Sequence, residues 1–303
     1  MRAGRFTFGS EGIAGLCGCI ALFVTGCGGG GGGGEATPTN QPPTAAARVT
    51  GEAVARAATV FDTAGTADVD GSIAARNWTY GDGESGTADS HTYRVPGSYT
   101  ATYQVTDDKG TSSRVSVRVN IAKCSVAGSA AAALSPHPTV CVQTSRGEMV
   151  FEVYPTQSPI TSSNFLKYVD DDFYAGTLFH RVIAGFVVQA GGYQAGMVSK
   201  PATYAPITLE SANGLQNWQY TLAMARTDQS NSATSQFFVN VVDNLALNYS
   251  AANPLPNGYA VFGQIIHGTA VVDAMANVTT GTASGFMDVP MEDIVIKGMV
   301  RLP

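Results

Sequence analysis

The sequence predicts an all-β-dominated protein, in which a β-sandwich is followed by a mostly antiparallel β-barrel with two helices. Segments of alternating apolar and polar residues recur along the chain and are separated by clusters of Asp, Gly and Pro, as strands and turns require. Helical spacing of apolar residues is confined to two short stretches near residues 159–169 and 269–277. Charged residues make up 13% of the 303 residues and the net charge is −6, so the chain lacks the basic composition of a nucleic-acid-binding protein.

The first residues have the pattern of an export signal. Arg2 and Arg5 precede an apolar run, roughly Ile13–Val24, that is shorter than the about twenty residues needed to span a bilayer core. The run ends in "VTGC", which resembles the lipobox of bacterial lipoproteins, with lipid on Cys27. The resemblance implies a signal peptide over residues 1–26 and a lipid anchor in the bacterial cell envelope. Gly28 after Cys27 is not the acidic residue that retains some lipoproteins in the inner membrane, so the expected location is the outer membrane, facing the periplasm or, as the alternative, the exterior. An ordinary signal peptide cut nearby is the alternative.

A flexible tether is expected next, over residues 27–45, because seven consecutive glycines and a Thr/Pro-rich stretch cannot form a core. Of the five cysteines, only Cys124 and Cys141 lie in the predicted mature domains. In an oxidising compartment an even pair predicts a disulfide, with two free thiols as the alternative. The four histidines are scattered without ligand spacing, so neither a metal nor a cofactor is expected.

The first module, residues 46–122, contains short strands with turn clusters between them, which indicates a β-sandwich. Strands are predicted at 99–105 and 114–120. The motifs "FDTAGTADVDGSIAARNWTYGDG", "HTY" and "PGSYTATYQVTDDKG" closely resemble the PKD domain, an immunoglobulin-like sandwich of extracellular proteins. That resemblance implies a spacer, or a module that contacts a protein or a glycan.

The second module, residues 137–303, follows a linker at 123–136. A hairpin is expected from two alternating runs around Ser145-Arg-Gly147, and a helix begins at Pro159, a residue suited to a first helical turn. A second helix is expected over 269–277. The expected strands cover residues 140–144, 149–153, 178–192, 220–242 and 259–265.

The chemistry of the second module depends on polar side chains within apolar strands. No nucleophile elbow and no phosphate-binding loop occurs in the sequence, yet Arg181 and Gln189 interrupt a segment rich in Phe, Val and Ile. The motifs "FHRVIAGFVVQAGG", "LAMARTDQSNSATSQFFVNV" and "YAVFGQIIHG" are similar, in order and spacing, to those of cyclophilin-type peptidyl-prolyl cis-trans isomerases. The variants "MAR" and "QFFVNV" resemble the bacterial periplasmic branch. The implied fold is an eight-stranded antiparallel barrel capped by two helices.

This family resemblance also implies roles for individual residues. Arg181, Gln189 and Phe186 are the residues assigned to catalysis: the arginine donates to the prolyl nitrogen, and the glutamine holds substrate backbone and steadies the arginine. Arg226 is expected to contribute its backbone to substrate binding, with its side chain in solvent. The residues expected to bind substrate are Val187, Ala225, Arg226, Gln236, Phe238, Leu247 and Tyr259.

The sequence departs from the family pattern at one pocket wall. Counting from Gln236 places the usual large aromatic residue at Ala246, and a slip by one residue would place Leu245 or Leu247 there. The function expected is isomerisation of X–Pro bonds in unfolded exported proteins and other proline-containing peptides. The alternative is a non-catalytic binding protein of the cell envelope, which clasps proline-containing segments and uses its PKD module for contact.

Overall fold

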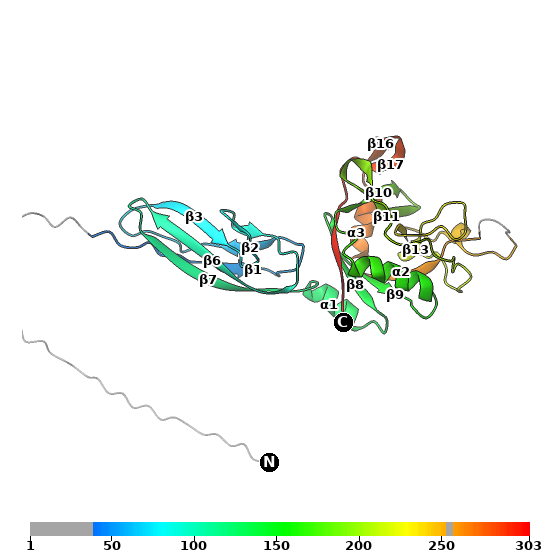
Figure 1. Cartoon of the computed structure of the whole chain (residues 1–303), viewed down its shortest axis with the longest axis horizontal. Coiled ribbons are helices and arrows are strands. Elements are labelled where there is room, and N and C mark those ends of the chain that lie inside the picture. Colours follow the sequence, from blue (N-terminus) through cyan, green and yellow to red (C-terminus); the bar gives the residue numbers. More distant parts are fainter. Residues whose placement is uncertain (1–38, 253–256) are drawn as a thin grey trace, which may run out of the picture. The chain divides into compact units, whose positions relative to one another are not determined.

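The structure is a computed structural model that describes residues 39–252 and 257–303. The expected signal peptide, Cys27 and most of the expected tether lie outside these residues. Strands dominate the described chain and form two modules, drawn in blue to cyan and in green to red in Figure 1. None of the described helices is both long enough and apolar enough to cross a membrane.

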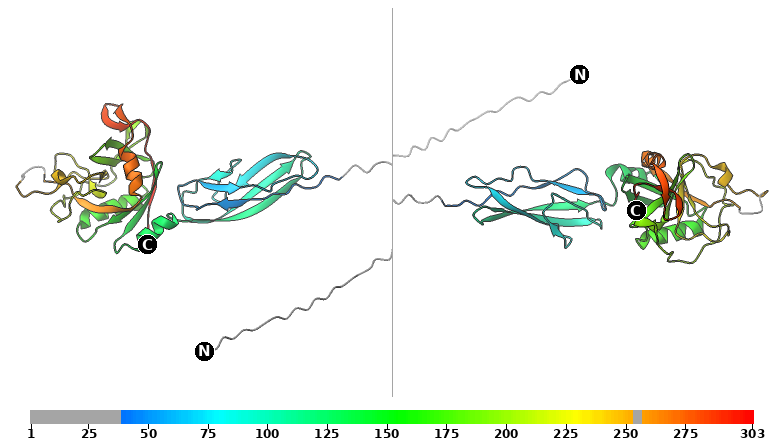
Figure 2. Two further views of the ribbon diagram at one scale, coloured as in Figure 1. Left: turned by 180° about the vertical axis from the view of Figure 1, so that it is seen from behind. Right: turned by 90° about the horizontal axis from the view of Figure 1, so that it is seen from above.

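The first module is a sandwich of two antiparallel sheets, whose two layers can be followed in Figure 2. One sheet has the order β1-β2-β5 and the other the order β4-β3-β6-β7. The longest pairing joins β6 and β7, which contain the predicted strands at 99–105 and 114–120. The strands are β1 (Arg48–Thr50), β2 (Thr59–Asp62), β3 (Ile73–Thr79), β4 (Ser85–Gly86), β5 (Ser90–His91), β6 (Gly97–Asp107) and β7 (Ser112–Ile121).

Aromatic residues from the PKD-like motifs form the core of this sandwich. Trp78 is buried between Phe61 and Tyr103, with ring centroids 4.4 and 4.7 Å away. Its indole N–H donates to the carboxylate of Asp89 at 2.9 Å, so the buried polar atom is satisfied. The hydroxyl of Tyr93 donates to the carbonyl of Tyr80 at 2.9 Å, and burial raises the pKa of Tyr93 to about 12. The motif residues are thus explained by packing.

The second module is a nearly closed antiparallel barrel of eight strands, in the order β10-β11-β14-β13-β15-β9-β8-β18. Hydrogen bonds from Phe179 N–H to the Ile294 carbonyl and from Gly176 N–H to the Ile296 carbonyl connect the start of the first strand with the start of the last one. The strands are β8 (Thr139–Thr144), β9 (Gly147–Val153), β10 (Thr177–Ile183), β11 (Val187–Gln194), β13 (Thr221–Met224), β14 (Phe237–Asn240), β15 (Val261–His267) and β18 (Ile296–Arg301). The short strand β12 (Val198–Ser199) pairs with β11 outside this order.

Two helices pack against the barrel, as the apolar spacing predicted. Helix α2 (Pro159–Asp170) starts with its proline in the first turn and buries Phe165 and Tyr168 in the main core. Helix α3 (Thr269–Ala276) buries Val272 and Met275 in the same core. Two single-turn 3₁₀ helices, η1 (Ala195–Met197) and η2 (Leu245–Leu247), and a hairpin of β16 (Thr280–Ala283) with β17 (Phe286–Pro290) complete the module.

The segment expected to be only a linker, residues 123–136, contains helix α1 (Val126–Ala133). Ser125 caps this helix by accepting a hydrogen bond from the N–H of Gly128 at 3.0 Å. Short helices are marginal in water even when rich in alanine. This one forms against the barrel, where Ala132 packs on a small buried cluster of Cys124, Cys141 and Val150.

Candidate active site

The strands β10 and β11 and the turn between them carry several residues of the site. Arg181 on β10 lies opposite Gln189 on β11, so both side chains project from the same face of the sheet. The turn that joins the strands contains Gly185 at φ +67°, a left-handed conformation that glycine adopts without steric cost. Phe186 follows in the turn and is free of the strand alternation, as the Ala184-Gly185 pair predicted.

Strand alternation separates two hydrophobic clusters in this part of the barrel. Val188 and Phe237 point into the main core, whereas Val187 and Phe238 belong to a second, smaller cluster on the opposite face of the sheet. A row of paired positions runs across five neighbouring strands on that opposite face. The row contains Arg181, Gln189, Phe238, Ala223 and Val261.

A small pocket of about 110 Å³ opens above this second cluster. Its volume suits a single small side chain, because pockets for drug-sized ligands usually exceed 300 Å³. Its walls come from three of the barrel strands, β10, β11 and β14, and from the loops beside the barrel. The lining residues are Arg181, Phe186, Val187, Gln189, Ala225, Arg226, Phe238, Leu247 and Tyr259.

A chain of polar side chains borders the pocket. Nη1 of Arg181 donates to Oε1 of Gln189 at 3.4 Å, and Nε2 of Gln189 donates to Oε1 of Gln236 at 2.9 Å. Arg181 is partly exposed, so its charge remains accessible from the pocket. Gln236 lines an adjoining cavity of about 230 Å³, which shares Gln189, Ala225 and Arg226 with the first pocket. The two cavities therefore form one groove with an apolar end and a polar end.

Of the residues that sequence reasoning assigned to the site, nine line the small pocket and Gln236 lies beside it. The side chain of Arg226 is the exception to what was expected. Its guanidinium donates from Nε and Nη2 to the carbonyl of Gly258, at 3.0 and 2.9 Å, and stacks over the ring of Tyr259 at 4.6 Å. The expectation of a side chain free in solvent was wrong, because the loop before β15 supplies a carbonyl and a ring that lie far along the sequence.

Comparison with known proteins agrees with this geometry. Residues 139–301 match the family described as cyclophilin type peptidyl-prolyl cis-trans isomerase/CLD, and residues 40–121 match the PKD domain family. A peptidyl-prolyl cis-trans isomerase of Streptomyces antibioticus is 48% identical over 159 residues, which are 52% of this chain and 95% of that protein. The chain belongs to the cyclophilin-type peptidyl-prolyl isomerase family.

Two further relatives carry the same enzyme name. Peptidyl-prolyl cis-trans isomerase B of Escherichia coli (strain K12) is 46% identical over 160 residues, covering 53% of this chain and 97% of that protein. An isomerase of Acinetobacter baylyi is 48% identical over 155 residues, covering 51% of this chain and 80% of that protein. The cyclophilin domain is therefore a peptidyl-prolyl isomerase, and the PKD domain precedes it.

A leucine forms the wall of the cyclophilin pocket beside the position where the family usually has an aromatic residue. Leu247 lines the pocket, whereas Leu245 and Ala246 are exposed and do not belong to its lining. Leu247 is held by backbone hydrogen bonds, since its N–H donates to Asn244 and its carbonyl accepts from Tyr259. Leu247 therefore lines the pocket, as the family resemblance implied for this residue.

Asn244 is a residue of the site that sequence reasoning missed. It is buried, and its Nδ2 donates to the carbonyl of Phe186 at 2.8 Å and to Oδ1 of Asn240 at 2.8 Å. Asn240 in turn donates to Asn217 at 3.2 Å. These amides tie the loop after β14 to the β10–β11 turn and so hold Leu247 opposite Phe186. A lone asparagine in a loop carries no sequence signal for such a role.

The bare backbone of Gly192 makes room for Gln236. A Cβ atom at Gly192 would lie 2.4 Å from Nε2 and 2.5 Å from Cδ of Gln236. Any larger side chain would displace the glutamine from its hydrogen bond with Gln189. A glycine at this position of β11 therefore lets the end of Gln236 lie against the strand and reach its partner.

His180 precedes Arg181 on β10 but is buried and turned away from the pocket lining. Burial lowers its pKa to about 4, an effect that the charge of Arg181 reinforces and a backbone hydrogen bond at Leu178 opposes. The imidazole is therefore neutral at neutral pH. It carries no charge that could serve the reaction there.

This shift predicts a loss of stability in acid. Because the pKa of His180 falls from 6.5 to about 4 on folding, the unfolded chain binds the proton more tightly, and stability falls as pH drops from 6.5 towards 4. Between pH 7 and pH 5 the free energy of unfolding should fall by about 2 kcal/mol more in the wild type than in His180→Gln. Urea unfolding of both proteins at the two pH values checks this. Equal losses in the two proteins would contradict it.

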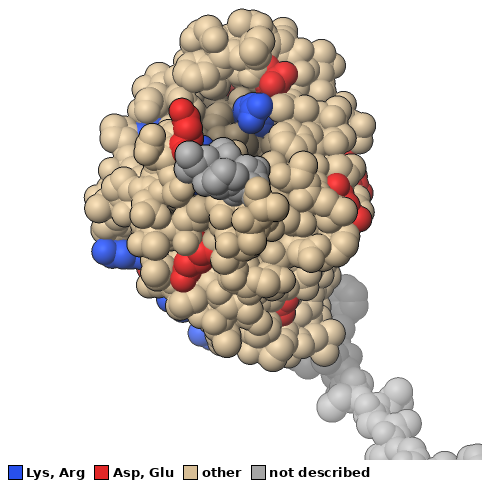
Figure 3. All heavy atoms as spheres, turned by 90° about the vertical axis from the view of Figure 1, so that its right-hand side faces the viewer, with Lys and Arg blue, Asp and Glu red and all other residues tan. Residues whose placement is uncertain are grey.

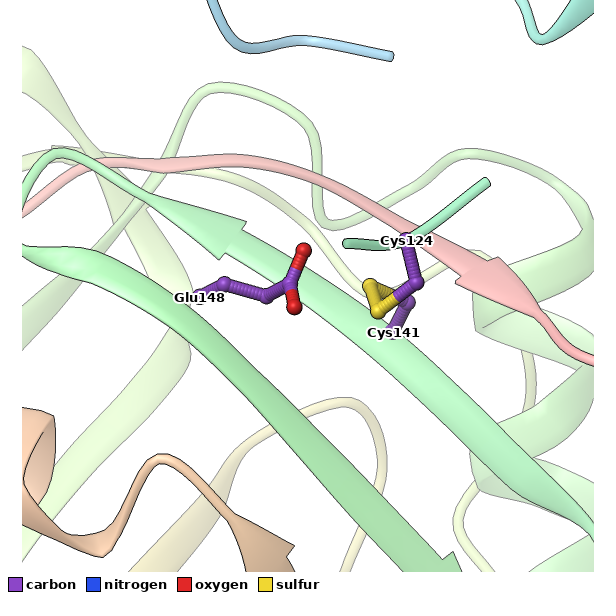
Figure 4. A group of neighbouring side chains, drawn as sticks. All are labelled: Cys124, Cys141 and Glu148. Carbon is purple, nitrogen blue, oxygen red and sulfur yellow. A yellow bond between two sulfur atoms is a disulfide. The ribbon is translucent and has the colours of Figure 1, made fainter. Parts of the chain in front are cut away.

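One other cluster has the composition of a metal site: Cys124, Cys141 and Glu148 lie together (Figure 4). The two sulfur atoms are joined in the disulfide that the cysteine count predicts, so neither offers a thiolate. The carboxylate of Glu148 is also engaged. It accepts hydrogen bonds from the N–H and hydroxyl of Ser125 and from the amide of Gln143. The cluster fastens the start of α1 to β8 and β9.

Proposed function

We propose that this isomerase acts by stabilising a twisted X–Pro amide without covalent chemistry. Rotation about the X–Pro bond is slow because resonance opposes it with a barrier of about 20 kcal/mol. Twisting removes that resonance and leaves a lone pair on the prolyl nitrogen. An enzyme accelerates the rotation if it binds this twisted state more tightly than either planar state.

Arg181 supplies the donor in this proposal. Its guanidinium lines the pocket and carries several N–H donors, so it can donate to the lone pair of the twisted nitrogen. Gln189 would hold both substrate backbone and the arginine through its bond to Nη1. The observation that carries the proposal is the Arg181 guanidinium at a pocket whose walls are mostly apolar. The other arginine of the lining, Arg226, donates instead to the carbonyls of Gly258 and Thr227.

The remaining walls would bind the proline ring and its flanking backbone. Phe186, Val187 and Phe238 offer the apolar contact surface, and the groove beyond them exposes the amide of Gln236. A rate acceleration of about 10⁵ requires roughly 7 kcal/mol, of which one positioned donor typically contributes about 3–4 kcal/mol. We assign the rest to orientation of the substrate and to exclusion of water from the amide.

The test of this function is an isomerisation assay with an X–Pro peptide on the chain lacking residues 1–26. Catalysed exchange between cis and trans peptide, followed by NMR, is the expected result. Binding of the peptide without faster exchange would contradict the proposal and favour a protein that only clasps proline-containing segments.

The clients we propose are unfolded exported proteins, and the location is the bacterial cell envelope. The support is the export signal and lipobox at Cys27, together with a PKD domain that would act as a spacer or contact a protein or glycan. The face drawn in Figure 3 shows few charged side chains, which suits contact with apolar segments of unfolded chains. Cys27→Ser should release the protein from membranes on cell fractionation. Continued membrane attachment of this variant would argue against lipidation.

A further inference from the structure

The hairpin of β16 and β17 brings an acidic side chain to Arg181. Oδ2 of Asp288 lies 3.7 Å from Nε of Arg181, and the two side chains are 41% and 42% exposed. Asp288 lies on β17, and residues 280–290 received no functional assignment from the sequence. It has a φ of +61°, a left-handed conformation that aspartate tolerates better than most residues.

Aromatic packing connects this hairpin to the strands that hold the site. The ring of Phe286 contacts Tyr193 on β11 with centroids 5.0 Å apart, and Tyr193 contacts His180 on β10 at 4.7 Å. His180 is buried directly beside Arg181 in the sequence. The position of Asp288 is thus set by packing against the same two strands that position Arg181 and Gln189.

Asp288 and Gln189 approach different nitrogens of the guanidinium. Asp288 faces Nε, whereas Gln189 accepts from Nη1 at 3.4 Å. Nη2 makes no hydrogen bond to any residue in the described ranges 39–252 and 257–303. Because a guanidinium is planar and rigid, contacts at two of its nitrogens fix the direction in which the third points.

We infer that Asp288 is a positioning residue for the isomerase reaction: it fixes the plane of the Arg181 guanidinium so that a free N–H is aimed at the prolyl nitrogen. This inference rests on the proposed role of Arg181 as the donor. Asp288 does not line the pocket, so it contributes little to ground-state binding. Its loss should therefore reduce kcat and leave KM nearly unchanged.

The size of the expected effect follows from the exposure of the pair. Both side chains are about two-fifths exposed and water screens their attraction, so the pair contributes modestly. We expect Asp288→Asn to lower kcat about threefold to fivefold with KM within twofold of wild type. The Asp288→Glu variant, which keeps the charge, should recover at least half of the lost rate.

The experiment measures kcat and KM on an X–Pro peptide for the full chain and its variants, with thermal unfolding to check that each is folded. Glu292→Gln is the matched control, because Glu292 is 81% exposed and pairs with Arg146. It should leave both constants unchanged. At about 1 M salt the Debye screening length shortens to about 3 Å. The wild-type kcat should then fall towards that of Asp288→Asn, whereas the kcat of the variant should change little.

A second background tests whether the effect passes through the arginine. In an Arg181→Lys protein, which lacks the planar donor group, Asp288→Asn should cause no further loss of kcat. The inference is overturned by a change in kcat of less than twofold, by a rise in KM as the main effect, or by an equal loss in the Arg181→Lys background. Full activity of Arg181→Ala would instead contradict the proposed role of Arg181. That result can be told apart from an unchanged kcat of Asp288→Asn, which contradicts only the inference about Asp288.

Discussion

Replacing Arg181 with alanine should lower kcat/KM on an X–Pro peptide by about 10²–10³-fold, because the variant loses the guanidinium that we propose donates to the prolyl nitrogen. The apolar walls remain in this variant, so peptide binding should weaken much less than turnover. Steady-state measurement of kcat and KM, together with binding by titration calorimetry, separates the two quantities.

Arg146→Ala is the control for this variant. Arg146 is also a partly exposed arginine with an acidic partner, Glu292, but it does not line the pocket. Its removal should leave kcat/KM within twofold of wild type. An Arg181→Ala protein with near-wild-type turnover would remove the arginine from the mechanism, and catalysis would then have to arise from the pocket walls and Gln189 alone.

Removing the disulfide should be the most damaging change outside the site. Cys124 and Cys141 are both buried at 1% exposure, and the chain between them carries α1. Closing a loop of this length is worth about 3 kcal/mol in the chain-entropy description. In a Cys124→Ala/Cys141→Ala protein, the best-protected amides of β8 and β9 should therefore exchange hydrogen on the order of 10²-fold faster.

Hydrogen exchange followed by mass spectrometry measures this effect segment by segment. Peptides from β6 and β7 of the PKD domain provide an internal control, because their core is separate from the cluster around the disulfide. Wild-type protein treated with a reductant should behave like the double variant. Protection of β8 and β9 that stays within threefold of wild type would show that packing of α1, and not the covalent link, holds this part of the barrel.

Much of the site could be predicted from short-range pattern. Two-residue alternation alone assigns Val187 and Gln189 to one face of a strand and Val188 to the other, and the structure has this arrangement. The Ala184-Gly185 turn is equally local. Helix α1 also had a local signal in Ser125 followed by an alanine-rich run, yet its existence depends on docking, since propensity cannot stabilise so short a helix.

By itself, the sequence determined the fold class, the family motifs and the set of residues around the proline pocket, because alternation and turn chemistry act between near neighbours. Only the tertiary structure decided which partners those residues have. Arg226 binds the Gly258 carbonyl, Asn244 donates to the Phe186 carbonyl, and Asp288 reaches Arg181. Each of these contacts joins segments that approach one another only when the barrel closes. Tertiary packing sets the direction of side chains that meet across such separations in sequence. A local sequence pattern contains no information about that packing.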